Sequence, residues 1–146
     1  MKGIVFILAL VLLASTVAAA EGAHTYYVQL IRGTDTAQAP QPKCRHAGPK
    51  LAATFGPVFK WTNYWELSLR EATLRPGEKA RLRLSPEREV EIDLAQPKER
   101  KITAFENGKV TDCTVSPAGE HMTIIGGKRE ASSGWFIVVR RDKPKD

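Results

Sequence analysis

The sequence predicts an all-β fold, an antiparallel β-sandwich or small barrel of about seven or eight strands with one short helix near residues 49–55. Apolar and polar residues alternate with a period of two in several segments, as in strands that have one buried face. The turn-forming pairs Pro76-Gly77 and Asn107-Gly108 separate such segments at short intervals. Consecutive strands joined by short turns are typical of antiparallel sandwiches and barrels.

The first 20 residues have the three parts of a secretory signal peptide. Lys2 gives a positive start, residues 4–13 form an apolar run, and residues 15–20 are mostly small. The apolar run is shorter than the about 20 residues that a membrane-spanning helix needs. We therefore expect cleavage after Ala20, a secreted or periplasmic location, and no transmembrane anchor in the mature chain.

The rest of the chain is expected to form a single all-β domain over residues 21–139, followed by a basic C-terminal tail at 140–146. A chain of 146 residues has room for one such domain behind the signal. Its net charge of +6 is spread along the chain, with acidic residues interleaved. Nucleic-acid-binding domains usually concentrate basic residues on one face or helix. We expect no nucleic-acid partner.

The first expected strand covers residues 25–32, and a proline-rich loop follows at 36–49. Prolines fix their own φ and disfavour helix at the residue before them, which indicates an extended loop. Pro49 can begin the short helix, because proline is tolerated at the first helical position. We expect Gly56 to end this helix in the left-handed conformation.

Strand alternation is expected to resume near Val58, with Phe59 and Trp61 on the inner face. In this interpretation, Asn63-Tyr64 forms a turn that exposes the Tyr64 ring. The next strand would place Trp65, Leu67 and Leu69 on one face and Glu66, Ser68 and Arg70 on the other.

Residues 80–84 and 90–94 are expected to pair as a hairpin through a loop at 85–89. This register matches apolar residues inside and opposite charges outside, and opposed charges stabilise a strand pair. The expected inner pairs are Leu84 with Val90, Leu82 with Ile92 and Ala80 with Leu94, and the outer pairs are Arg83 with Glu91 and Arg81 with Asp93.

Asn107-Gly108 predicts a second hairpin, because a type I′ turn needs positive φ at both central positions. We expect it to pair Glu106 with Lys109, Phe105 with Val110, Ala104 with Thr111 and Ile102 with Cys113, which places Cys113 in the core. A third hairpin would join residues 122–125 to 135–139 through a loop at 126–134. The run at 135–139 is apolar on both faces, which is typical of a central strand covered on both sides.

The chain has two cysteines, Cys44 and Cys113. An even pair in an exported chain suggests a disulfide, and two unpaired thiols are the alternative. The histidines are His24, His46 and His121, and neither they nor the cysteines have the close paired spacings of a zinc site. We expect no metal and no cofactor.

No motif predicts catalysis. Glu87, Glu89, Glu91 and Asp93 alternate, so a strand would line them on one face. Opposed arginines would lower the pKa values of these carboxyl groups, the reverse of what a general acid needs. The chain has no G-x-S-x-G, and the glycines at 126–127 do not complete a phosphate-binding loop.

Five aromatic residues fall within residues 55–65, and Trp61, Tyr64 and Trp65 are the candidate binding residues. Tyr and Trp combine an apolar ring with a polar tip and are favoured at binding surfaces. An exposed platform of such rings would suit a polysaccharide. Strand alternation favours Phe59, Trp61 and Trp65 as core residues instead, which leaves Tyr64 as the best candidate for an exposed ring.

These observations favour a non-catalytic protein-interaction module of the cell envelope, whose partner is another envelope protein. The surfaces that we consider for it are a sheet edge, the loop at 126–134 and the Tyr64 turn. A carbohydrate-binding module that uses the aromatic platform is the alternative, and a small secreted hydrolase is the second.

Overall fold

The computed structural model describes residues 22–130 and 132–145, and over these ranges it contains nine strands and one helix. The expected signal peptide, residues 1–20, lies outside the described residues. In chain order the elements are β1 (His24–Thr34), β2 (Arg45–His46), α1 (Pro49–Phe55), β3 (Asn63–Leu74), β4 (Lys79–Arg83), β5 (Arg88–Asp93), β6 (Glu99–Glu106), β7 (Lys109–Pro117), β8 (Met122–Glu130) and β9 (Ser133–Arg140).

Within the described part, no helix is long and apolar enough to cross a membrane.

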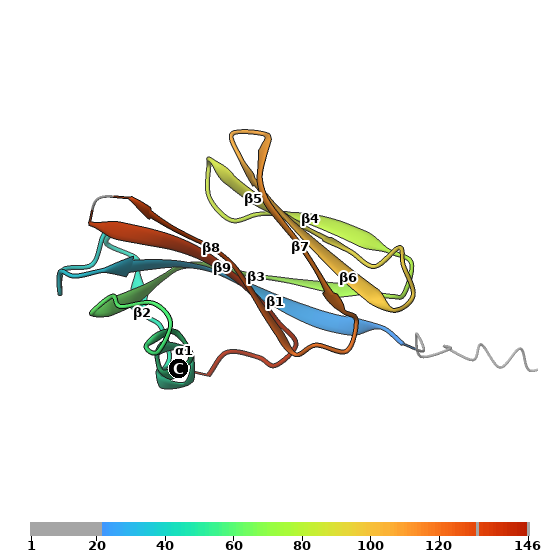
Figure 1. The fold of residues 1–146 in the computed structure, drawn as a ribbon, viewed down its shortest axis with the longest axis horizontal. Helices are drawn as coiled ribbons and strands as arrows, with labels where there is room; N and C mark the ends of the chain where they lie inside the picture. The colour runs from blue at the N-terminus through green and yellow to red at the C-terminus, as the bar shows by residue number, and fades with distance from the viewer. Residues whose placement is uncertain (1–21, 131, 146) are drawn as a thin grey trace, which may run out of the picture.

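The strands form two antiparallel sheets that pack against each other as a sandwich (Figure 1). Sheet A has five strands in the order β2-β3-β1-β9-β8, and sheet B has four in the order β4-β5-β6-β7. The predicted all-β class with one short helix is confirmed. The strands are slightly more numerous than expected because the loop before α1 contributes the two-residue β2.

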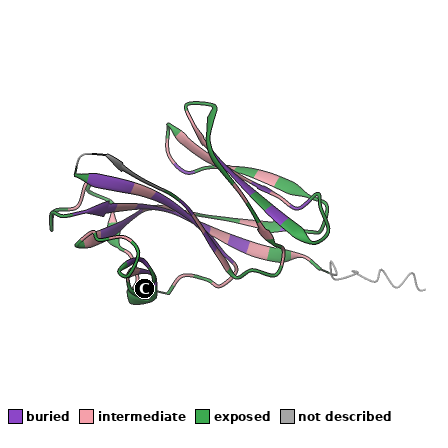
Figure 2. Ribbon diagram, in the orientation of Figure 1, coloured by how far each residue is buried: buried purple, intermediate pink, exposed green. Residues whose placement is uncertain are grey.

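The central strands of sheet A, β1 and β9, are mostly buried (Figure 2). The face toward sheet B holds a core that includes Val28, Leu30 and Val139. The opposite face holds a second cluster beneath α1, which includes Phe136 and Val138. The apolar run of β9 is therefore covered on both sides, as predicted, and β9 lies between β1 and β8.

The helix α1 forms over the residues predicted for it and buries Leu51 and Phe55 against sheet A. The expected left-handed Gly56 is wrong, because Gly56 has φ −52° and ψ −43°. Its N–H donates to the carbonyl of Ala52, so Gly56 continues the right-handed helical turn instead of ending it with a left-handed residue. The amides of Val58 and Phe59 then both donate to the Phe55 carbonyl.

The β4–β5 hairpin forms, but its register differs by two residues from the prediction. Arg83 pairs with Glu89, Arg81 with Glu91, Leu82 with Val90 and Ala80 with Ile92. Pro86 lies second in a tight turn over residues 85–88, where the Arg88 N–H donates to the Ser85 hydroxyl at 3.1 Å. Proline and serine favour these positions of a turn, so the loop is shorter than expected. A shift of two residues keeps each side chain on its predicted face.

The β6–β7 hairpin begins as predicted. Asn107 and Gly108 have φ of 50° and 79°, as a type I′ turn requires, and Phe105 pairs with Val110. A bulge then shifts the register, so Ala104 pairs with Asp112. Beyond the bulge, each β7 side chain lies on the face opposite to the one predicted for it. Cys113 is therefore exposed, and its predicted place in the core is wrong.

A chain of hydrogen bonds ties the C-terminal segment and α1 to the helix-side face of sheet A. Buried Glu66 accepts hydrogen bonds from Arg45 at 2.8 Å and from Gln29 at 2.6 Å. Buried Arg140 donates to Gln29 at 3.4 Å and binds both oxygens of Asp142. Lys50 of α1 completes the chain with an ion pair of 3.1 Å to Asp142. Burial of Arg140 and Glu66 is thereby compensated by partners.

We predict that the ion pairs of Asp142 contribute to stability at neutral pH and lose this contribution in acid. Hydrogen bonds from Arg140, and then from Lys50, lower the pKa of Asp142 below its usual value. A lowered pKa stabilises the folded state above the unfolded pKa of about 3.9, and the effect is lost as pH falls through the folded pKa.

Asp142→Asn should therefore unfold more easily at pH 7, by about 0.5–1 kcal/mol because the carboxylate is partly exposed. The difference from wild type should shrink between about pH 5 and pH 2 in urea unfolding experiments. Asp35→Asn, at an exposed site, is the control. A pH-independent difference would contradict the prediction.

Candidate interaction surfaces

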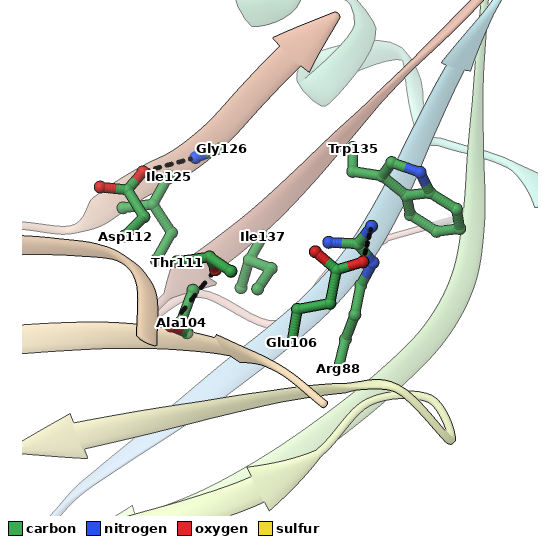
Figure 3. A pocket seen from close by; sticks show the side chains of 9 residues that line it. All are labelled: Arg88, Ala104, Glu106, Thr111, Asp112, Ile125, Gly126, Trp135 and Ile137. Carbon is green, nitrogen blue, oxygen red and sulfur yellow. Dashed lines mark hydrogen bonds and ion pairs between the residues drawn. The ribbon is translucent and has the colours of Figure 1, made fainter. Parts of the chain in front are cut away.

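A cavity of about 250 Å³ lies between the two sheets (Figure 3). Sheet B contributes strands β5, β6 and β7 to its wall, and sheet A contributes β8 and β9. The lining residues are Arg88, Ala104, Glu106, Thr111, Asp112, Ile125, Gly126, Trp135 and Ile137. The cavity therefore combines apolar walls with one guanidinium and two carboxylates.

The turns of sheet B place the charged pair of the cavity. Arg88 ends the turn at 85–88 and Glu106 begins the Asn107-Gly108 turn, and the two residues are opposite each other in the β5–β6 register. Their ion pair is 3.5 Å long. This is longer than the about 2.7–2.9 Å of a strong charge-assisted hydrogen bond. The Arg88 side chain is 15% exposed, and none of its nitrogens is among the buried atoms without a partner.

Trp135 of β9 lies next to two guanidinium groups. The Arg88 guanidinium carbon is 4.4 Å from the Trp135 ring centroid, and that of Arg32 is 5.0 Å from it. Both contacts fall within the range of cation–π attraction. Since Arg88 belongs to sheet B and Trp135 to sheet A, their contact joins the two sheets at the cavity. The Nε atom of Arg32 is buried without a hydrogen-bond partner.

Asp112 joins the edge strands β7 and β8 at the other side of the cavity. Its carboxylate accepts the N–H of Cys113 at 2.8 Å and the N–H of Gly126 at 3.2 Å. Both strands are irregular here, because β7 bulges beside Ala104 and β8 shifts register after Gly126. The bulges release these N–H groups from the ladders, and Asp112 satisfies them.

The outer face of β7 is exposed and apolar. β7 is the last strand of sheet B, and Val110 and Val115 are 61% and 55% exposed. Cys113 lies between them and is also exposed. An edge strand presents unpaired backbone groups, so β7 can pair with an extended segment of another chain.

The three aromatic residues singled out from the sequence do not form an exposed platform. Tyr64 and Trp65 are only 6% and 5% exposed. Trp65 lies in a strand, β3, as predicted, whereas Tyr64 belongs to β3 instead of the turn expected for it. Tyr64 stacks on Phe55 with centroids 4.9 Å apart, and burial raises the pKa of its phenol. Trp65 donates to the Thr34 hydroxyl at 3.0 Å and packs on His46.

Trp61 has a structural position on the helix-side face of sheet A. It lies in the segment before β3, so the predicted strand through Phe59 and Trp61 is wrong. Its indole lies against Gly33 and Gly134, which pair with each other in the β1–β9 ladder. A Cβ built on Gly134 would lie 2.8 Å from the indole nitrogen. The glycine pair therefore provides the space that Trp61 occupies.

The alternating carboxylates of β5 do not form a catalytic pair. Glu89 binds Arg81 at 2.5 Å and Arg83 at 3.0 Å on the outer face of sheet B. The hydrogen bond from Arg81 lowers the pKa of Glu89, which disfavours a general-acid role. Among residues 22–130 and 132–145, no group of three or more His, Cys, Asp or Glu could hold a metal ion.

Cys44 and Cys113 are free thiols in the structure. Cys44 directly precedes β2 of sheet A and is half-buried, whereas Cys113 is in β7 of sheet B.

Sequence reasoning missed the cavity residues Arg88 and Trp135. The sequence shows Trp135 only as the start of an apolar strand, and nothing local connects it to a residue of another sheet. The opposite charges of Arg88 and Glu106 would have been the available signal, given the β5–β6 register.

Comparisons with protein-family models, curated proteins and solved structures give no match. The function is therefore argued from the geometry.

We predict that Gly134→Ala destabilises the fold by about 1–3 kcal/mol, because the added methyl group overlaps the Trp61 indole. Urea unfolding measures the change. Gly119→Ala is the matched control, since nothing lies within 4 Å of a Cβ at that position. The penalty should shrink in a Trp61→Ala background, and an equal penalty in both backgrounds would show that Trp61 is not its cause.

We predict two reactive thiols in purified, unreduced protein after unfolding, because both cysteines are free. In the folded protein, a thiol reagent such as Ellman's reagent should modify exposed Cys113 faster than half-buried Cys44. Cys113→Ser should remove the fast phase and leave one thiol after unfolding. Absence of thiols before reduction would contradict the prediction.

Proposed function

We propose that this chain is an exported, non-catalytic interaction module of the cell envelope, which binds a partner protein along the edge strand β7. The single observation that supports this most directly is the exposed apolar outer face of β7 on an unpaired sheet edge. An extended partner segment could add to β7 through main-chain hydrogen bonds. Its side chains would then cover Val110, Cys113 and Val115.

The engagement of the cavity side chains supports a binding role over a catalytic one. Arg88 and Glu106 pair with each other, and Asp112 accepts two backbone N–H groups. The Thr111 hydroxyl donates to the Ala104 carbonyl at 3.3 Å. The residues that line the cavity thus include no nucleophile beside a base, which covalent catalysis requires.

Site-specific photo-crosslinking tests the proposed partner surface. A benzophenone amino acid at Val110 or Val115, in the full chain produced in the source cells, should give a discrete covalent adduct after illumination. The same substitution at Val58 is the control, because Val58 is 69% exposed but follows α1 beside sheet A. The β7 positions should crosslink and Val58 should not.

A competition experiment separates a specific partner from chance neighbours. Purified wild-type protein should suppress the adduct, whereas Val115→Lys should compete several-fold less well, because a lysine on an edge strand opposes strand addition. Equal crosslinking at all three positions, or equal competition by both proteins, would refute docking at β7.

A further inference from the structure

We propose that the cavity between the sheets is a binding site for a small organic carboxylate with an apolar body. The carboxylate would bind the Arg88 guanidinium, and the apolar part would lie against Ile125 and Ile137. This site is distinct from the outer face of β7 and goes beyond the proposed protein interaction.

The long ion pair of Arg88 is the first argument. A guanidinium has five N–H donors in a planar fork that matches a carboxylate. Among the described residues, the charged partner of Arg88 is Glu106, at 3.5 Å. No Arg88 nitrogen is among the buried atoms without a partner, so the donors that Glu106 does not hold open to the cavity, where a ligand can reach them. A second, better-placed carboxylate would therefore bind favourably.

The position of the guanidinium is fixed before any ligand arrives. The turn at 85–88 holds the Arg88 backbone, and the Trp135 ring lies 4.4 Å from the guanidinium carbon. A preorganised group loses less conformational entropy on binding than a mobile surface arginine. Arg88 thus differs from Arg83, whose side chain is 67% exposed on the outer face.

The walls and the size of the cavity define the rest of the ligand. Ile125, Ile137 and Ala104 give an apolar lining, and Figure 3 shows Ile137 between the Asp112 side and the Arg88 side. Sites for drug-sized molecules usually have about 300–1,000 Å³. A volume of about 250 Å³ instead suits a compact ligand such as an arylacetate.

Glu106 acts as an internal competitor in this arrangement. Its side chain is 41% exposed, so it can leave Arg88 and be solvated when a ligand carboxylate arrives. Removing its charge should favour ligand binding, whereas removing the charge of Arg88 should abolish it. The two substitutions in one ion pair are therefore expected to have opposite effects.

Titration of the full chain with phenylacetate, followed by the indole N–H resonances in ¹⁵N-HSQC spectra, tests the proposal. Trp135→Phe assigns the Trp135 signal. We expect a saturable shift of this signal with a Kd of about 1–10 mM, as for other ligands of this size. Neutral phenylacetamide has the same shape and should bind at least about fivefold more weakly, given the strength of charged hydrogen bonds.

The variants provide the decisive comparison. Arg88→Gln should lose the saturable shift, Glu106→Gln should tighten binding about two- to fivefold, and Arg83→Gln should match wild type. Equal binding of acid and amide, or weaker binding by Glu106→Gln, would overturn the proposal. Retained dispersion of the HSQC spectrum shows that each variant is folded. Crosslinking at Val115 should persist in Arg88→Gln, so this proposal and the β7 interaction can fail separately.

Discussion

The central constraint on this fold is that β9 must be buried on both faces. Its apolar run cannot lie at a sheet surface, so one side needs a second sheet and the other needs a separate cover. Sheet B supplies the first, and α1 with the aromatic segment before β3 supplies the second. The polar chain from Arg45 to Lys50 then ties this second cover to sheet A. The short helix would be marginal alone and depends on this packing.

The two faces of sheet A are covered in different ways, by α1 on one side and by sheet B on the other. The two candidate binding surfaces, the cavity between the sheets and the outer face of β7, both belong to the sheet B side. The helix side is sealed by rings stacked around Phe55 and by Trp61 on its glycine pair. On the other side, charged residues at the tips of the sheet B hairpins face Trp135, and the sheets leave a cavity between them. Nothing covers the outer face of sheet B among the described elements, and the exposed Val110 and Val115 lie there on the edge strand β7.

Local patterns in the sequence predicted the fold class, the helix limits and the turns at Pro76-Gly77 and Asn107-Gly108, because each depends on residues close together in the chain. The loop expected at 126–134 was wrong, because β8 runs to Glu130 and β9 begins at Ser133. The registers were less predictable. In the β4–β5 hairpin, the turn preference of Pro86 made the loop shorter than expected. In the β6–β7 hairpin, the bulge beside Ala104 moved Cys113 to the opposite face of the sheet. The aromatic interpretation failed at Tyr64 because alternation says nothing of a helix that covers the other face. The cavity could not be derived, since Arg88 and Trp135 meet only through the packing of two sheets.

The strand order of sheet A also determines when the molecule can be completed. β1 pairs with β9, so residues near the start of the domain must wait for those near its end. Sheet B contains only neighbouring strands of the chain and closes through short loops. Contacts between distant residues form slowly because loop closure costs entropy first. Sheet B and the β2-β3-β1 part of sheet A can therefore assemble while synthesis continues, whereas β8 joins sheet A only when β9 arrives between it and β1.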